Sequence, residues 1–437
     1  MKKITLQTRR EFLRGTLLTS ALSWTVPAFL ANTFSSIQAD AADRTTQVIT
    51  GRDGSILVVL QMAGGNDGLN TVIPIGNEFY EEARPRLRID PSQSLKLNDG
   101  FGFHPALRGL KELFDAGQLG VIHGVGYPNP NRSHFRSTEI WQTASDSERF
   151  EKHGWIGRYF DHACGGAEPT IGVNVGRQVP QAFAARTPKG VSLDNPRNYR
   201  VPDFAAGMNG DTETGEMMRD GSPDDANAGG SIAALGGAAM EGVSARDYLE
   251  RTALDAQVSS EQIRAVSERV QNQAVYPGSQ LGNSLKLVAR LIGGGLPTRI
   301  FYVSQGGYDT HANQAGAHER LLRDLGDSLK SFMNDMKEQG NSERVMVMTF
   351  SEFGRRVAEN ANGGTDHGAA APMFVVGGKV KPGIHGTFPS LAPQDLFQGD
   401  LKFTTDFRRI YAGVLENWLK TGSVPVLGRK FEPFAVV

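Results

Sequence analysis

Cysteine is almost missing from this chain of 437 residues, because Cys164 is the only one. An internal disulfide needs two cysteines, so packing, hydrogen bonds and bound ions must hold the fold together. Zinc sites built from several thiolates are excluded for the same reason. An excess of charge of either sign is also lacking, since 46 Lys and Arg stand against 47 Asp and Glu. The charge balance therefore gives no reason to expect nucleic acid or an anionic membrane as a partner.

The first forty residues have the pattern of a sorting signal. Two lysines precede the segment Thr8-Arg-Arg-Glu-Phe-Leu-Arg14, a modestly apolar run covers residues 16–31, and Ala39-Asp-Ala41 follows. This order predicts a twin-arginine export signal at residues 1–41, with the twin-arginine translocase as a transient partner and a periplasmic or secreted location. The alternative is a membrane-anchoring helix. Pro27 and scattered Ser and Thr disfavour it, so we expect no stable membrane span after processing.

Short apolar runs alternate with amphipathic segments through the rest of the chain, which is 39% hydrophobic overall. Strands are expected at 55–60, 118–123, 299–303, 345–350 and 372–376, and helices at 105–116, 318–339 and 406–420. Strands without polar interruptions are typical of parallel sheets that are buried on both faces. The β-α-β order predicts an α/β fold with a largely parallel central sheet over residues 42–437.

One part of this expected domain differs in composition. Residues 205–243 are rich in Gly, Ala, Asp and Ser and contain few large apolar side chains. Such a segment cannot cover a core, so we expect a flexible surface insertion there. Residues 245–272 follow as an expected surface helix, with a lid or a partner-facing helix as the alternative.

Hard metal ligands lie just after three of the expected strands and in one further loop. They are Asp67, Asp309, His311, Glu352 and His367. The carboxyl ends of parallel strands share one edge of a sheet, so these side chains are expected to converge there. Oxygen and imidazole donors without sulfur suit Zn, Mn, Mg or Ca. We therefore expect one or two divalent ions at this edge, whose identity the sequence leaves open.

Two of these motifs also have an ordinary structural interpretation. The glycines of the 64–68 segment can form a structural turn or a phosphate-binding nest. Asp309 can be a helix N-cap, with His311 at the start of the helix that follows.

A candidate nucleophile lies in the segment Asn129–Trp141, which follows the expected strand at 118–123. Ser133 stands where a helix is expected to begin, and there the free N–H groups and the helix dipole would lower the cost of an alkoxide. Arg132 or Arg136 could hold an oxyanion beside it. The alternative is that Ser133 simply caps the helix. His134 could be a metal ligand, although a packed or surface histidine is the commoner role for such a residue.

Together these motifs resemble the alkaline phosphatase and sulfatase superfamily, and more narrowly its exported branch called domain of unknown function 1501. The motifs that carry the resemblance are Gly-Gly-Asn-Asp-Gly at 64–68, Arg-Ser-His-Phe at 132–135, Asp-Thr-His at 309–311 and Ser-Glu-Phe-Gly-Arg at 351–355. The resemblance extends over about residues 56–378. It implies an alkaline-phosphatase-like three-layer sandwich with a two-metal centre.

The resemblance also implies roles for single residues. Asp309 and His367 would bind the first metal, whereas Asp67 and Glu352 would bind the second. Ser133 would be the nucleophile and would bridge both ions.

This sequence departs from the superfamily pattern at two positions. His311 follows its aspartate at a shorter spacing than is usual, and Phe353 stands where a second-metal histidine is expected. A one-metal enzyme therefore remains an alternative to the two-metal centre.

These observations predict an exported metal-dependent hydrolase of phosphate or sulfate esters that acts on a small-molecule or glycan ester. Formylglycine chemistry is disfavoured, because neither Cys164-Gly-Gly-Ala nor Ser133-His-Phe-Arg contains the Cys/Ser-X-Pro-X-Arg pattern. A phosphotransferase or phosphomutase would share the metals. The alternative from another class is a non-catalytic periplasmic binding or assembly protein that keeps the fold.

Overall fold

The structure is a computed structural model that describes residues 50–51, 54–176, 179–187, 189–193, 259 and 261–437. The predicted export signal at 1–41 and the predicted insertion at 205–243 lie outside the described residues. Of the expected helix at 245–272, residues 259 and 261–272 are described; residues 259 and 261–269 are helical, and residues 270–272 are not. Within the described ranges, no helix has both the length and the apolar character needed to cross a bilayer.

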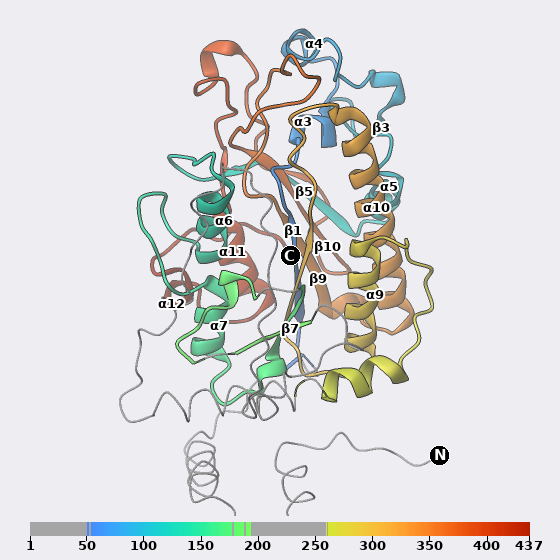
Figure 1. Cartoon of the computed structure of the whole chain (residues 1–437), viewed down its shortest axis with the longest axis vertical. Helices are drawn as coiled ribbons and strands as arrows, with labels where there is room; N and C mark the ends of the chain where they lie inside the picture. The colour runs from blue at the N-terminus through green and yellow to red at the C-terminus, as the bar shows by residue number, and fades with distance from the viewer. Residues whose placement is uncertain (1–49, 52–53, 177–178, 188, 194–258, 260) are drawn as a thin grey trace, which may run out of the picture.

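A nine-stranded sheet forms the centre of the molecule (Figure 1). Eight strands follow the order β11-β5-β10-β9-β1-β8-β6-β7, and β12 pairs with β5. Their bounds are β1 Ile56–Met62, β5 Leu119–Gly126, β6 Gly172–Val175, β7 Val191–Leu193, β8 Ile300–Gln305, β9 Val345–Phe350, β10 Ala371–Gly377, β11 Gly383–His385 and β12 Thr405–Asp406. The strand pairs are parallel except for those that β10 makes with β5 and β9. The predicted largely parallel sheet is confirmed.

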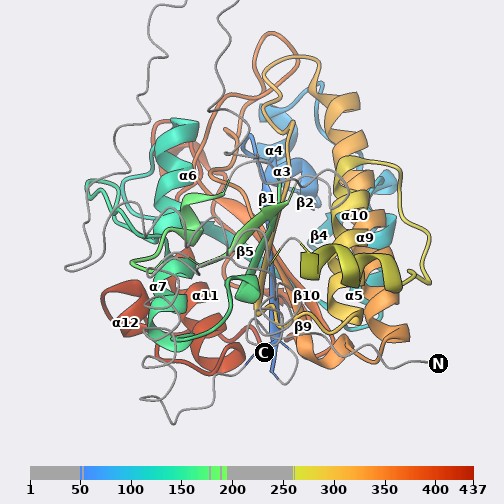
Figure 2. The ribbon, with the colours of Figure 1, turned by 60° about the horizontal axis from the view of Figure 1, so that its bottom comes forward.

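Helices cover both faces of this sheet, as Figures 1 and 2 show. On one face lie α5 Arg108–Asp115, α9 Gln280–Gly293 and α10 Gln314–Glu338. On the other lie α6 His134–Thr143, α7 Trp155–Ala163, α11 Phe407–Gly413 with a π-helical turn Val414–Trp418, and α12 Val424–Leu427. The expected three-layer α/β sandwich is therefore confirmed.

The alternating side chains of β1 explain why the sheet is covered on both faces. Val58 and Leu60 belong to one core cluster, which includes the buried leucines of α5, α9 and α10. Leu57 and Val59 belong to a second cluster, where aromatic side chains of α6, α7 and α11 gather. Successive side chains of a strand point to opposite faces, so an unbroken apolar run must be buried twice.

Smaller elements lie beyond the carboxyl end of β1. They are α3 Gly68–Thr71, α4 Glu78–Ala83, and a three-stranded sheet of β2 Val72–Pro74, β4 Phe101–Phe103 and β3 Leu95–Lys96.

Single 3-10 turns occur elsewhere along the described chain, at Pro91–Gln93, Pro169–Ile171, Gln181–Phe183, Ser342–Arg344 and Pro393–Asp395.

The direction of β10 matters for the position of the site. Because β10 runs antiparallel to β9, the loop between them begins and ends at one edge of the sheet. Since β1 and β8 are parallel to β9, their carboxyl ends reach the same edge. The loops after β1, β8 and β9 therefore meet there.

Candidate metal centre

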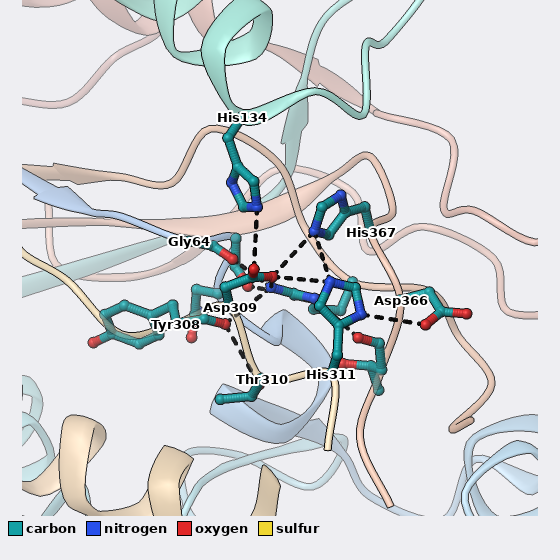
Figure 3. Close-up of polar contacts among 12 residues, drawn as sticks. Gly64, His134, Tyr308, Asp309, Thr310, His311, Asp366 and His367 are labelled. Atoms are coloured by element: carbon teal, nitrogen blue, oxygen red, sulfur yellow. Dashed lines mark hydrogen bonds and ion pairs between the residues drawn. The ribbon is translucent and has the colours of Figure 1, made fainter. Parts of the chain in front are cut away.

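Four side chains from three parts of the chain converge on this edge (Figure 3). Asp309 and His311 lie in the loop after β8, His367 lies in the loop between β9 and β10, and His134 is the first residue of α6. Asp309 stands at the centre of the group. Ligand atoms of His134, Asp309 and His367 all lie within 4.8 Å of one another.

The Nε2 atoms of all three histidines face the Asp309 carboxylate. Oδ1 of Asp309 lies 3.0 Å from Nε2 of His311 and 3.1 Å from Nε2 of His367. Oδ2 lies 3.4 Å from Nε2 of His134. The Nε2 atoms of His311 and His367 are themselves only 2.9 Å apart. Three ring nitrogens and a carboxylate thus point into one small volume.

The opposite ring nitrogen of each histidine faces an oxygen that can only accept a hydrogen bond. Nδ1 of His134 donates to Oε1 of Glu352 at 2.9 Å, and Nδ1 of His367 donates to the carbonyl oxygen of Arg132 at 2.8 Å. Nδ1 of His311 lies 3.4 Å from Oδ1 of Asp366. In the neutral form of each ring, these partners place the proton on Nδ1 and leave a lone pair on Nε2. Metal-bound histidines are usually oriented in this way.

The charges at the centre suit a cation. Burial raises the pKa of Asp309, but the ion pair with Arg355 and the other polar groups around the carboxylate together outweigh burial and lower this pKa to about 2. Burial lowers the pKa of His367 below its ordinary value. The aspartate is therefore anionic and the His367 ring neutral near pH 7. Lone pairs that face a carboxylate at these distances repel one another unless a cation joins them, so the arrangement fits a metal ion.

Arg355 joins the loops that carry the ligands. Its guanidinium group is fully buried and donates to the carbonyl oxygens of Gly65 at 2.7 Å, Thr365 at 2.9 Å and Tyr308 at 3.0 Å. It also forms an ion pair with Asp309 at 2.7 Å. One buried side chain thus fixes the loops after β1, β8 and β9 relative to one another.

Glu352 is buried beside His134 and not in the centre of the cluster. Its Oε1 accepts the Gly64 N–H at 2.8 Å and also Nδ1 of His134. Its backbone carbonyl accepts hydrogen bonds from Nε1 of Trp141, at 2.8 Å, and from the Ser137 hydroxyl. Oε2 is buried and has no hydrogen-bond partner among the described residues.

Ser133 is exposed at the N-cap position of α6, so the expected helix start is confirmed. Its hydroxyl makes no capping hydrogen bond, whereas its N–H is bonded to Oδ1 of Asn131 at 2.8 Å. The hydroxyl is therefore not used as a cap, and it lies next in sequence to His134. Both features are compatible with a nucleophile.

The two arginines expected near the nucleophile have other partners. Arg132 forms an ion pair with the buried carboxylate of Asp400 at 2.6 Å. Arg136 donates to the carbonyl oxygen of Ser147 at 2.8 Å and lies over the Phe150 ring, 4.0 Å from its centroid. Both guanidinium groups thus stabilise loops, and their contacts do not favour the expected oxyanion role.

Asp67 also has other partners. Its carboxylate forms a 2.6 Å ion pair with Arg84, and both side chains are fully buried. It also accepts hydrogen bonds from the amide of Gln314 and from the N–H of Asn70, whose helix it caps. Burial raises the pKa of Asp67, but the charge and hydrogen bond of Arg84, together with His318 and Gln314, outweigh burial and lower the pKa. Asp67 thus faces a buried network and not the three histidines, which does not favour its expected role as a second-metal ligand.

His134 lies in the centre beside Asp309 and His367, although its sequence position favoured a packed or surface histidine. The available signal was its position next to Ser133 in the Arg-Ser-His-Phe segment. Phe353 completes the surroundings, because its ring centroid lies 4.9 Å from that of His134 and 4.5 Å from that of His367. An apolar ring therefore stands where the superfamily pattern would place another ligand.

Comparisons with known proteins agree with the motif resemblance. The family model described as "Protein of unknown function (DUF1501)" matches residues 55–427. The curated proteins contain no match to this chain.

Solved structures that the chain resembles include the lipoteichoic acid synthase LtaP from Listeria monocytogenes, with 8% identity, coverage of 80% of this chain and 73% of that one, and a TM-score of 0.35. The C-terminal periplasmic domain of EcEptC from Escherichia coli has 9% identity, 77% and 78% coverage, and a TM-score of 0.36. A protein in the alkaline phosphatase superfamily from Vibrio parahaemolyticus has 10% identity, 88% and 72% coverage, and a TM-score of 0.34. At TM-scores this low, the likenesses assign no activity to the chain.

Proposed function

The chain belongs to the DUF1501 family, and on this premise we propose that it is an exported metal-dependent hydrolase of phosphate or sulfate esters. Ser133 is the nucleophile, and Asp309, His311 and His367 hold a divalent ion. Export uses the twin-arginine translocase, for which Arg9 and Arg10 supply the arginine pair. The observation that carries the proposal is the convergence of three Nε2 atoms on one anionic carboxylate. Ser133, whose hydroxyl makes no capping hydrogen bond, directly precedes one of these histidines in the sequence.

The start of α6 supplies what an anionic ester needs. The first N–H groups of a helix have no intrahelical acceptor, and the helix dipole favours negative charge there. Ser133 lies at this end of a ten-residue helix and is open to solvent. A bound divalent ion would supply Lewis-acid stabilisation of the ester oxygens. Asp309 is about half exposed, so a substrate can reach the centre from solvent.

The reaction proceeds in two displacements. The Ser133 oxygen forms a bond to the phosphorus or sulfur atom while the bond to the alcohol oxygen breaks and the alcohol leaves with a proton. Water then attacks the same atom, the bond to Ser133 breaks, and a proton from the water returns to the serine oxygen. A monoester releases phosphate or sulfate, and a diester releases a phosphate monoester. Covalent catalysis of this kind divides one difficult step into two easier ones.

The test is hydrolysis of 4-nitrophenyl phosphate, bis-(4-nitrophenyl) phosphate and 4-nitrophenyl sulfate, with Zn, Mn, Mg or Ca supplied singly. We expect kcat/KM for the best ester to fall by about 1000-fold or more in Ser133→Ala, because the covalent step is lost. Ser342→Ala is the matched control, since Ser342 lies before β9 at the opposite edge of the sheet. Equal kcat/KM for Ser133→Ala and wild type would remove Ser133 from the reaction.

Phe353 favours a second candidate, a binding or assembly protein that keeps the metal without turnover. Its ring packs against two of the histidines, where a further ligand is usual for the superfamily. A protein of this kind would bind an ion yet hydrolyse none of the three esters, and Ser133→Ala would change none of its properties.

A further inference from the structure

We infer that this centre holds one ion bound by four protein ligands, with His134 as the fourth ligand and Glu352 as its positioning residue. The inference rests on the metal centre of the proposed function but not on its reaction. It assigns Glu352 a different role from the direct metal ligand that the superfamily resemblance implies.

The contacts of His134 carry the first step. Its Nε2 is buried and has no hydrogen-bond partner among the described residues, and it lies 3.4 Å from Oδ2 of Asp309. Its other nitrogen is held by Glu352 at 2.9 Å. Leaving a buried polar atom unpaired costs about 1–3 kcal/mol. Coordination of an ion by the Nε2 lone pair would offset this cost.

The second step concerns Glu352. Oε1 of Glu352 already accepts two hydrogen bonds, from Nδ1 of His134 and from the N–H of Gly64. A carboxylate behind a ligating histidine fixes the tautomer of the ring and raises its basicity. Glu352 is itself held by its backbone carbonyl, which accepts hydrogen bonds from α6. The same helix therefore supplies the ligand and anchors the residue that orients it.

The rival assignment is a second ion bound by Glu352. Its Oε2 is buried without a partner among the described residues, so this oxygen is available in principle. A second ion would need further ligands, however. Both oxygens of Asp67 accept hydrogen bonds from buried groups, namely Arg84, Gln314 and Asn70. The neighbouring Phe353 ring offers no ligand atom. The described contacts thus bring together His134, Asp309 and His367, with His311 beside the last two, and only a single oxygen of a second set.

The ligand set narrows the choice of metal. Three imidazole nitrogens and one carboxylate suit Zn²⁺ and other transition ions, and Zn²⁺ with four protein ligands can take a fifth ligand when an ester binds. Mg²⁺ and Ca²⁺ prefer sites made of oxygen atoms. We therefore expect the purified chain to bind Zn²⁺ much more tightly than Mg²⁺ or Ca²⁺.

Metal binding by the full chain tests the inference without any substrate. Metal-free protein is titrated with Zn²⁺, the bound metal is counted by elemental analysis, and X-ray absorption at the zinc edge counts the imidazole ligands. Wild type is expected to bind one Zn²⁺ per chain with three imidazoles. Co²⁺ in place of Zn²⁺ reports the coordination geometry through its visible absorption.

Two variants separate ligand from positioning residue. His134→Ala is expected to weaken Zn²⁺ binding by about 100-fold or more and to reduce the imidazole count to two. Glu352→Gln is expected to weaken binding by about 10–100-fold while three imidazoles remain, as is typical for the partner of a ligating histidine. His385→Ala and Glu338→Gln are the matched controls, because both residues lie outside the centre. Circular dichroism of each variant checks that it is folded.

Three results would overturn the inference. The first is two Zn²⁺ ions per wild-type chain and one in Glu352→Gln, which would make Glu352 a ligand. The second is unchanged Zn²⁺ affinity in His134→Ala, and the third is fewer than three imidazoles in the wild-type absorption spectrum. The last measurement needs no variant to fold. A chain that binds one Zn²⁺ through His134 but hydrolyses no ester would support this inference and contradict only the proposed hydrolase.

Discussion

At the scale of single residues, a buried ion pair fixes the position of the Gly-Gly-Asn-Asp-Gly segment. Asp67 and Arg84 are both without exposed side-chain surface and lie 2.6 Å apart. Arg84 also donates to the carbonyl oxygen of Val357 at 2.8 Å, and Gln314 joins Asp67 to Thr365. The pair thus connects the loop after β1 to the loop that carries His367.

Replacement of Asp67 by Asn is expected to destabilise the fold by about 3–5 kcal/mol at pH 7, because Arg84 is left as a buried charge without its partner. The folded pKa of Asp67 lies below the unfolded value of 3.8. Its contribution is therefore complete above pH 3.8 and is lost as the pH falls through the folded pKa. Urea unfolding between pH 7 and pH 3 measures this effect. The stability difference between wild type and Asp67→Asn should shrink below pH 3.8, and a constant difference would contradict the assignment.

At the scale of elements, the loops after β1 and β8 approach one another so closely that only glycine fits between them. Gly64 has a φ of +117°, and a Cβ there would lie 2.4 Å from the backbone nitrogen of Asp309. Its N–H also holds Glu352. The position of Asp309, and with it the centre of the ligand set, thus depends on a glycine in another loop.

Gly64→Ala is therefore expected to do more than strain the backbone. It should destabilise the protein by about 1–3 kcal/mol and also weaken Zn²⁺ binding by about 10-fold or more, because Asp309 must shift. Gly76→Ala is the control, since Gly76 has a φ of +68° but nothing within 4 Å of the added Cβ. It should cost about 1 kcal/mol and leave Zn²⁺ affinity unchanged. Urea unfolding and Zn²⁺ titration of both variants measure these effects. If Gly64→Ala bound Zn²⁺ as tightly as wild type does, the loop would tolerate the added Cβ without moving Asp309.

Elements are also where the sequence is most predictive. The expected strand at 345–350 coincides with β9, and the expected strands at 55–60 and 299–303 differ from β1 and β8 by only a few residues. These strands could be predicted because each is an uninterrupted apolar run, which is typical of a strand buried on both faces of a sheet. The antiparallel direction of β10 was not predicted, since an apolar run has no signal for direction. Helices α7 and α9 were also missed.

The side chains of the centre could be predicted only where their position followed from a strand end. Asp309 and His367 belong to loops at the shared edge of the sheet, so strand order alone brings them together. A strand end does not fix the contacts of Arg132 or of Asp67, because these depend on charge partners elsewhere in the chain. Asp400 is 268 residues from Arg132 in the sequence, and nothing in the local sequence marks Arg84 as the partner of Asp67.

At the scale of the whole molecule, the ligand set crosses from one layer of the sandwich to the loops of the sheet. His134 belongs to α6, which packs on one face, whereas Asp309 and His367 come from loops at the sheet edge. An ion bound to all three would join His134 to Asp309, which lies 175 residues later in the sequence, and to His367, which lies 233 residues later. Binding of the ion should therefore stabilise the folded chain as a unit.

Zn²⁺ at about 100 times its dissociation constant is expected to raise the free energy of unfolding by about 2.7 kcal/mol, which corresponds to a Tm increase of a few degrees. Differential scanning calorimetry with and without Zn²⁺ measures this shift. His134→Ala should lose most of it at the same Zn²⁺ concentration, because its affinity is lower. Asp67→Asn should start from a lower Tm yet gain as much from Zn²⁺ as wild type does, since Asp67 faces Arg84 and not the ion. If Asp67→Asn instead folds but gains nothing, Asp67 is a metal ligand after all and the ion pair with Arg84 must open on binding.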